Sequence, residues 1–354
     1  MASIDELIYD LNNGDEKTRA FAAEDIAFDG VPGGTKILVD RLGLEESRFV
    51  REVIVNCLKG LRGREIVERI IPLLSSEDAF IRNSSIEILS LQGEIATEFM
   101  RKLLGDPDKD IRKFALDILF QLKSLDTAEL IAEALNDPDI NNLITSVEYL
   151  GHLEDINYTP RVNELFMRSD NILLRCTCLE TLAFIGDEES MRCVNKMYPS
   201  YDNISILEQY SFLKFVARKG SDIHLRLIIS LIAEKGKVMH KEIINAVEGI
   251  LKRHPRKLLP PDLLNALSYY LQTDISDINK YELLILMGHY QNPEIYKILL
   301  EHVGNKQTLI RMGAVEGLGL YGNNEALPVL LAMKEKEGDE DLLETIDKSI
   351  DQLR

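Results

Sequence analysis

The chain has 354 residues, of which 45% are hydrophobic and 6% aromatic, and it contains no tryptophan. Its 59 acidic and 41 basic residues give a formal net charge of −18, which repels a nucleic-acid backbone and favours basic partners, so we expect no DNA binding. The longest apolar stretch, residues 227–233, is far shorter than the roughly twenty residues that cross a bilayer, so we expect no membrane span.

The amino terminus and the cysteines indicate a cytoplasmic protein. Residues 1–6 run directly into a predicted helix, without the basic start or the apolar core of a signal peptide. The four cysteines do not have the spacing of a disulfide framework, which makes a reducing compartment the expectation. Cys176 and Cys178 point about 200° apart on a helix, so they do not form a metal-binding pair.

Residues 1–215 repeat one pattern about every 31 residues. The registers are marked by Arg19, Arg51, Arg82, Arg112 and Arg175, with Leu143 in the one position that breaks the series. Three residues after each register comes a small or apolar residue: Ala22, Ile54, Ser85, Ala115, Ser146 and Cys178. A fixed period of this length indicates a solenoid, in which each unit buries its apolar face against its neighbours.

Residues 95–122 show how one repeat is built. Two apolar-periodic segments, 95–104 and 111–122, flank a turn rich in Gly, Asp and Pro, which predicts a first helix, a turn and a second helix. Asp108 or Asp110 can cap the second helix, because its free N–H groups and its dipole favour a carboxylate.

The register loosens after residue 215 and returns near the carboxyl terminus. We predict about eleven helix pairs, divided into a regular array (1–215), an irregular basic segment of the same solenoid (216–275), and a carboxy-terminal array with its cap (276–354). Within the irregular segment, only 243–251 has the pattern of a second helix.

The turn and the second helix resemble the HEAT repeat, in the short bacterial form called the phycobilin-lyase HEAT-like repeat. The residues that carry the resemblance are Asp106-Pro107-Asp108, Ile111-Arg112, Ala115-Leu116, Ile310-Arg311, Ala314-Val315 and Leu318-Gly319. It covers nearly the whole chain, and it implies an all-α solenoid, a right-handed superhelix with a concave groove lined by the second helix of each pair. In that family a turn acid and the arginine form a ladder between neighbouring repeats, and Asp106 and Arg112 hold the matching positions.

The arginine column could bind phosphates or carboxylates, but the spacing favours a structural role. An acid precedes each arginine by four to six residues: Asp15, Glu46, Asp78, Asp106 with Asp108, and Asp170. We therefore expect Arg82 and Arg112 to contact acids in their own or adjacent turns.

A second column of acids follows the registers by five residues and points away from the buried stripe. With nearby aromatic residues it predicts an acidic-aromatic groove that suits a basic or amphipathic protein segment. The predicted partner-binding residues are Glu87, Phe114, Asp117, Glu148, Glu180, Phe184 and Tyr210. The alternative is that glutamate, a common helix former, merely solvates this face.

Residues 214–257 reverse the charge, with eleven basic and four acidic residues, so this segment is +7 and the remainder of the chain is −25. The segment could dock an acidic partner or a phosphate, or pair with the acidic groove of another copy. It could equally relieve self-repulsion within the molecule. The candidate residues for an anionic partner are Lys235, Lys237, Lys241, Lys252, Arg253, Arg256 and Lys257.

The sequence gives little evidence for a catalytic or metal-binding motif. The six histidines are scattered and no HExxH motif occurs. Deoxyhypusine hydroxylases, which are HEAT-repeat enzymes, carry His-Glu pairs that hold di-iron, and this chain has no His-Glu dipeptide. We expect no catalytic site, no metal and no cofactor.

These observations favour a non-enzymatic scaffold or adaptor that binds a protein or peptide in its groove. The alternative is a lyase- or chaperone-like accessory factor that holds a client protein while a cofactor is attached, which only the phycobilin-lyase resemblance suggests. The repeat itself does not choose a partner, because one fold hosts many functions.

Overall fold

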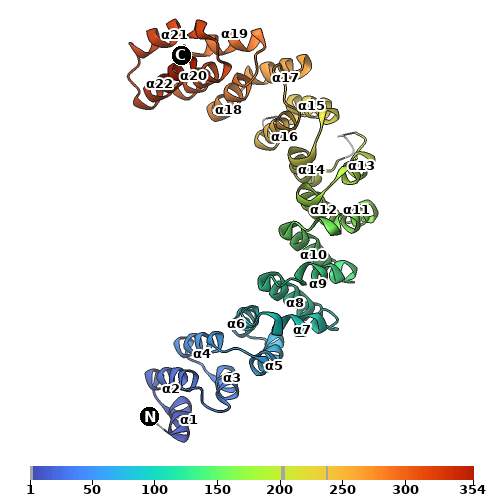
Figure 1. Cartoon of the computed structure of the whole chain (residues 1–354), viewed down its shortest axis with the longest axis vertical. Helices are drawn as coiled ribbons and strands as arrows, with labels where there is room; N and C mark the ends of the chain where they lie inside the picture. The colour runs from blue at the N-terminus through green and yellow to red at the C-terminus, as the bar shows by residue number, and fades with distance from the viewer. Residues whose placement is uncertain (1–2, 201–203, 237) are drawn as a thin grey trace. The chain divides into compact units, whose positions relative to one another are not determined.

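The computed structural model describes residues 3–200, 204–236 and 238–354, and these residues form helices joined by short turns (Figure 1). The described ranges contain 22 α-helices, the number that eleven helix pairs would contain, and no strand. The predicted all-α solenoid class is confirmed. No helix in these ranges has an apolar stretch that could span a bilayer.

The chain divides into two compact units, an amino-terminal unit (Met1–Tyr158) and a carboxy-terminal unit (Thr159–Arg354). The helices of the amino-terminal unit are α1 (Ile4–Asn13), α2 (Glu16–Phe28), α3 (Gly34–Leu44), α4 (Arg48–Gly60), α5 (Arg64–Ile70), η1 (Ile71–Ser75), α6 (Ala79–Ser90), α7 (Glu94–Leu103), α8 (Lys109–Leu122), α9 (Thr127–Glu133), η2 (Ala134–Asn136), α10 (Ile140–Leu153) and η3 (Ile156–Tyr158).

The carboxy-terminal unit continues the alternation of first and second helices. Its helices are α11 (Thr159–Arg168), α12 (Ile172–Ile185), α13 (Glu188–Met197), α14 (Ile206–Lys219), η5 (Asp222–His224), α15 (Leu225–Lys235), α16 (His240–Arg253), α17 (Pro261–Leu271), α18 (Asp277–Gly288), α19 (Pro293–His302), α20 (Thr308–Tyr321), η6 (Asn324–Ala326), α21 (Leu327–Lys334) and α22 (Glu340–Leu353). The division at 215 and 275 that the register predicts stays a prediction.

Two layers of helices build each unit. In the amino-terminal unit the even-numbered helices α2 to α10 pack one on the next, and the odd-numbered helices α1 to α7 do the same on the other side (Figure 1). In the carboxy-terminal unit α12 packs on α14 and α14 on α16, while α18 packs on α20 and α20 on α22. The second helices of the repeats thus form a continuous row within each of these stretches.

Polar turn residues, four acids and one serine, explain where the second helices of the amino-terminal unit begin. The N-cap residue of each accepts a hydrogen bond from a backbone N–H of the first turn: Asp15, Ser47, Asp78, Asp108 and Asp139. Such a cap stabilises a helix by about 1 kcal/mol. Asp108, rather than Asp110, is the cap of α8, which decides between the two predicted residues.

The small residues of the repeat lie in the helix contacts, as the period predicts. Each of the six predicted core positions is at most 3% exposed: Ala22, Ile54, Ser85, Ala115, Ser146 and Cys178. Ala314, at the same place in the carboxy-terminal repeat of Arg311, is also buried. Small side chains here let neighbouring helices approach closely, and this contact holds the repeats in one register.

Two glycines bring helices of the carboxy-terminal unit into backbone contact. A Cβ atom at Gly249, in α16, would lie 1.9 Å from the carbonyl oxygen of Ala217 in α14. At Gly288, in α18, it would lie 2.5 Å from the carbonyl oxygen of Gly317 in α20. Neither position can accept a side chain without displacing backbone, so α16 and α18 need glycine there.

Candidate protein-interaction surface

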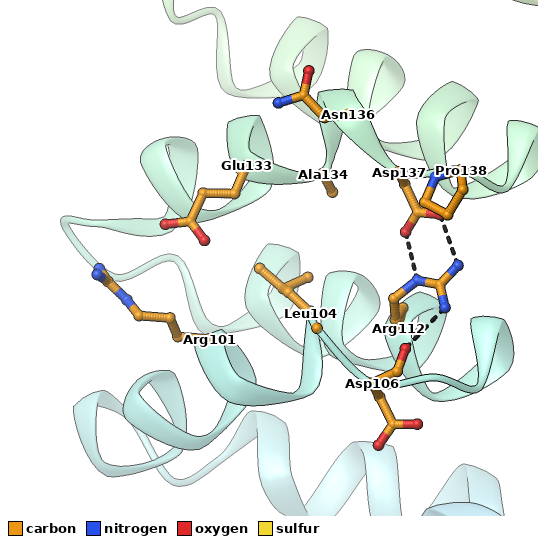
Figure 2. A pocket seen from close by; sticks show the side chains of 10 residues that line it. Arg101, Leu104, Asp106, Arg112, Glu133, Ala134, Asn136, Asp137 and Pro138 are labelled. Carbon is orange, nitrogen blue, oxygen red and sulfur yellow. Dashed lines mark hydrogen bonds and ion pairs between the residues drawn. The ribbon is translucent and has the colours of Figure 1, made fainter.

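The arginine column forms a ladder between repeats. Arg112 Nε and Nη2 donate to the two carboxylate oxygens of Asp137, both at 2.8 Å, while Nη1 donates to the carbonyl oxygen of Asp106 at 2.9 Å (Figure 2). The two side chains are only 10% and 3% exposed. They line a cavity of about 430 Å³ between the turns of neighbouring repeats. Arg112 therefore fastens its own turn to the next one.

The same link recurs at four other registers, and the acid always comes from the following repeat. The ion pairs are Arg19 with Glu45, Arg51 with Asp78, Arg175 with Glu208, and Arg311 with Glu337. The predicted ladder is confirmed for Arg112, but its acid is Asp137 rather than Asp106, which contributes its carbonyl group.

Arg82 lacks this link. Its Nη1 donates to the carbonyl oxygens of Ser76 and Glu77, at 2.6 and 2.8 Å, in its own turn. Arg82 therefore contacts an acidic residue as expected, but through the backbone carbonyl group of Glu77 and not through a carboxylate. Nearby, an exposed ion pair of 3.5 Å joins Arg64 in α5 to Glu98 in α7.

The ladder keeps its buried carboxylates charged. Burial alone would raise the pKa of Glu45, but hydrogen bonds from Arg19, Arg41 and the backbone N–H of Ser47 outweigh it and lower this pKa to about 2. The same balance at Asp137, with Arg112 as the main donor, holds its pKa below the usual value. These perturbed groups serve structure, since each is neutralised within the ladder.

Three carboxylates of the predicted groove lie on consecutive second helices of the amino-terminal unit. Glu87 is on α6, Asp117 on α8 and Glu148 on α10, and these helices pack in that order. We call these three residues the acidic stripe. Glu180 on α12 and Tyr210 on α14 belong to the carboxy-terminal unit, so a stripe across four repeats stays a prediction.

Asp117 is the most enclosed member of the acidic stripe. It accepts hydrogen bonds from Lys113 Nζ at 2.5 Å and from the Tyr149 hydroxyl at 2.6 Å. The Tyr149 ring stacks on Phe120 with centroids 4.1 Å apart, and Phe114 lies half-buried one turn before Asp117. Burial, and then the Asp117 carboxylate, raise the pKa of the Tyr149 hydroxyl, which therefore stays a donor.

The other two carboxylates of the stripe are more exposed, and both have partners. Lys59 in α4 forms an ion pair with Glu87, and the His152 ring lies 3.7 Å from Glu148. Glu87 also lines a cavity of about 320 Å³ between α4 and α6, together with Phe80. The stripe thus combines carboxylates, aromatic rings and exchangeable cations on one row of helices.

The predicted groove residues of the carboxy-terminal unit have a different environment. Glu180 accepts from the Ser211 hydroxyl at 2.8 Å and from Lys214 Nζ at 2.9 Å. The guanidinium of Arg218 lies 4.0 Å from the centroid of the Phe184 ring, in a cation–π contact. Basic residues therefore surround Phe184, where the sequence predicted carboxylates around it.

Sequence reasoning did not find the partners of these carboxylates. Lys113 and Asp117 are four residues apart on one helix, which is a readable signal for an ion pair. Tyr149 and Arg218 reach residues on neighbouring helices, and no spacing within one helix reports such a contact.

The predicted patch for an anionic partner is only partly brought together. Lys237 and the side chain of Lys235 lie outside the described residues. Lys241 and Lys257 are exposed and line no cavity that we describe. The members that line cavities are Lys252, Arg253 and Arg256.

Comparison with known proteins identifies the repeat. Residues 264–346 match the family described as HEAT repeats. Importin beta has the same fold, with a TM-score of 0.65 and 12% identity over 99% of this chain and 57% of importin beta. Kap121p gives a TM-score of 0.55 and 12% identity over 99% of this chain and 46% of Kap121p. Residues 264–346 are thus similar to HEAT repeats, and the fold of the whole chain is similar to that of the two solenoids.

One curated relative of this chain is an enzyme. A deoxyhypusine hydroxylase from Aspergillus oryzae is 37% identical over 84 residues, which are 23% of this chain and 25% of the relative. This chain spans about half the length of the two similar solenoids, and its match to the hydroxylase covers a quarter of that protein.

The di-iron centre of that enzyme class does not fit the residues of this chain. The sequence has no His-Glu dipeptide, and within the described ranges no three His, Cys, Asp or Glu side chains gather in a group that could hold a metal ion. His240 is buried, with Nδ1 2.8 Å from the Tyr270 hydroxyl and Nε2 3.2 Å from Glu282.

Proposed function

We propose that this chain is a non-enzymatic scaffold that binds a basic or amphipathic protein segment on the acidic stripe of its amino-terminal unit. The observation that carries the proposal is the row formed by Glu87, Asp117 and Glu148 on α6, α8 and α10. A cytoplasmic location and independence of any cofactor are part of this proposal. The lyase- or chaperone-like alternative rests on the resemblance alone and is not carried further.

Charge supports a basic partner. The amino-terminal unit contains 31 acidic and 17 basic residues, a net charge of −14. A field of this sign accelerates the encounter with a cationic segment, and salt weakens the effect.

The cations already on the stripe set what the partner must offer. Lys113 and Lys59 bind their carboxylates as point charges on flexible stems. An arginine of the partner can replace either lysine, because its planar guanidinium binds a carboxylate through two parallel hydrogen bonds. Phe114 and the stacked pair Phe120 and Tyr149 supply apolar surface beside Asp117.

Proteins of similar fold hold protein partners. Kap121p has been solved bound to Ste12p and bound to the SUMO protease Ulp1p, with TM-scores of 0.51 and 0.52 to this chain. At 12% identity the likeness concerns the fold alone. It supports the idea that a solenoid of this kind can act as a scaffold.

The test is the binding of a fluorescent arginine- and leucine-containing peptide, followed by stopped-flow anisotropy at low and high salt. Asp117→Lys with Glu148→Lys should lower the association rate about tenfold at low salt, and the difference should shrink as salt rises. Phe114→Ala should instead raise the dissociation rate at every salt concentration, because it removes apolar contact.

The matched control changes the same charge on the other layer of the unit. Glu129→Lys with Glu133→Lys alters two exposed acids of α9 and should leave the association rate within about twofold. If the control slows association as much as the stripe variant does, net charge alone drives binding and the stripe is no site.

A further inference from the structure

A second surface, of opposite charge, lies in the carboxy-terminal unit. The carboxyl-terminal parts of α12, α14 and α16 line an open surface cavity of about 570 Å³. Four cations and one acid line it: Arg218, Lys219, Lys252, Arg253 and Glu248. The unit as a whole has 28 acidic and 24 basic residues, so its net charge is slightly negative. The positive charge of this cavity is therefore a local feature of the surface.

Backbone contacts fix one cation of the cavity in place. Arg253 donates to the carbonyl oxygens of Val216, Ala217 and Gly220 at 2.9, 2.8 and 3.0 Å. Gly249 makes this possible, since the absence of its side chain lets α16 approach α14. These carbonyl groups use three of the five N–H donors of Arg253 and do not neutralise its charge.

The acids of the neighbourhood are already paired with other cations. Glu248 pairs with Lys252 at 3.0 Å, Glu180 with Lys214 at 2.9 Å, and Asp222 with Arg256 at 2.5 Å. In the described part of the chain, no carboxylate lies within ion-pair distance of Arg218, Lys219 or Arg253. A partner's carboxylates can supply what is missing.

The pKa of Lys219 reflects the positive charge of this neighbourhood. Burial lowers the pKa of its ammonium group, and the charges of Arg218 and Arg253 lower it further, against a small opposing effect of Asp187. An anion bound between these groups relieves their mutual repulsion.

A smaller cavity continues the first one. It measures about 260 Å³, shares Glu248 and Lys252 with the larger cavity, and reaches α18. Arg256 lines it, and so do apolar side chains such as Ile285 and Leu286. We call the two cavities together the basic groove.

We propose that the basic groove binds an acidic protein segment, whose carboxylates lie against Arg218, Lys219 and Arg253 and whose apolar side chains lie against Ile285 and Leu286. The site is independent of the acidic stripe and selects the opposite charge. A segment fits better than a free anion, because the two cavities share Glu248 and Lys252 and the smaller one adds apolar side chains to the cations of the larger. Glu248 lies where the cavities join, pairs with Lys252, and opposes an acidic ligand through its negative charge.

The experiment measures the affinity of the full chain for a fluorescent peptide of about ten residues with alternating glutamate and leucine, and for its glutamine counterpart. Arg218→Gln with Lys219→Gln should raise Kd about tenfold. The matched control, Lys241→Gln with Lys257→Gln, removes the same charge from the same basic segment outside the groove and should change Kd by less than about twofold.

A gain of affinity provides a readout that a folding defect cannot mimic. Glu248→Gln removes the opposing carboxylate, so the acidic peptide should bind severalfold more tightly. Binding of the basic peptide used for the stripe should be unchanged in all these variants, which separates failure of this site from failure of the proposed function.

Several results would overturn the proposal. One is that the groove and control variants raise the Kd of the acidic peptide equally. Another is that the chain binds the glutamine peptide as tightly as the acidic one. A third is that millimolar inorganic phosphate displaces the acidic peptide completely. A concentration-dependent dimer in sedimentation that Arg218→Gln with Lys219→Gln abolishes would also overturn it, because the occupant would then be a second copy.

Discussion

The two units use the same repeat but differ in how neighbouring helices are joined and in the charge of their surface. In the amino-terminal unit the links are ion pairs between turns, from Arg19, Arg51 and Arg112. In the described part of the carboxy-terminal unit, Arg175 and Arg311 make such links, and backbone contact at glycines also joins several second helices.

The difference shows that the ladder is one of two ways in which this chain joins its repeats. Where an arginine reaches the next turn, its charge is neutralised by the acid that it binds there. Where glycines bring backbones together, the basic residues of that stretch do not have to link the repeats. The basic groove forms at such a place, beside Gly249.

The largest expected effect tests whether the two units are separate in stability. Ala115→Asp, in α8, puts an unpaired carboxylate into a helix contact with no exposed surface and should cost about 3–5 kcal/mol. Ala314→Asp, in α20, makes the matched change in the other unit. Hydrogen exchange followed by mass spectrometry should show loss of protection mainly in the mutated unit. Equal loss in both units for either variant would break the comparison.

The ladder itself should give a smaller effect that depends on the register. Arg112→Met leaves the buried carboxylate of Asp137 without its main donor and should cost about 3 kcal/mol in urea unfolding. Arg82→Met removes only bonds to backbone carbonyls and should cost less than about 1 kcal/mol. Adding Asp137→Leu to Arg112→Met should recover most of the loss. Similar costs for both single variants would remove the distinction between linked and unlinked registers.

The smallest expected effect appears as a pH dependence. The pKa of Glu45 is lowered in the folded state, from 4.5 to about 2, so its stabilisation is complete above pH 4.5 and is lost as pH falls toward 2. Glu45→Gln should therefore destabilise the amino-terminal unit by about 2 kcal/mol at neutral pH and by almost nothing near pH 2.

Glu208 provides the corresponding test in the carboxy-terminal unit. Burial opposes ionisation there, but Arg175, Ser205 and Tyr198 hold the pKa of Glu208 below its usual value. The gap between wild type and Glu208→Gln in urea unfolding should also close as pH falls. A gap that stays constant with pH, for either variant, would mean that the folded-state pKa is not lowered.

Much of the fold could be predicted from the sequence, because the period of about 31 residues indicates which positions face a neighbouring helix. The spacing placed Ala115 and Cys178 in helix contacts, and it placed the cap of α8 at one of two acids. The partner of Arg112 was misplaced by one repeat, since turns one period apart carry similar acids and the spacing cannot tell which of them an arginine reaches.

The surfaces were less predictable for a physical reason. Contacts such as Tyr149 with Asp117, or Arg218 with Phe184, depend on how neighbouring helices are rotated, which a one-dimensional pattern does not contain. The charge excess of residues 214–257 was visible, but burial decides which of its cations remain without a partner, and Lys219 was not chosen.

The unlinked register at Arg82 has a mechanical consequence. An ion pair joins α4 to the turn before α6, and a buried ion pair joins α8 to the turn before α10. Among the described residues, the junction between α6 and α8 has packed helices and the exposed pair of Arg64 with Glu98. Apolar contacts separate gradually under load, while an ion pair resists until it breaks. When the amino-terminal unit is stretched along its row of helices, we expect the contact between α6 and α8 to open first. The repeats on either side of this contact should stay folded and pack together again when the load is removed.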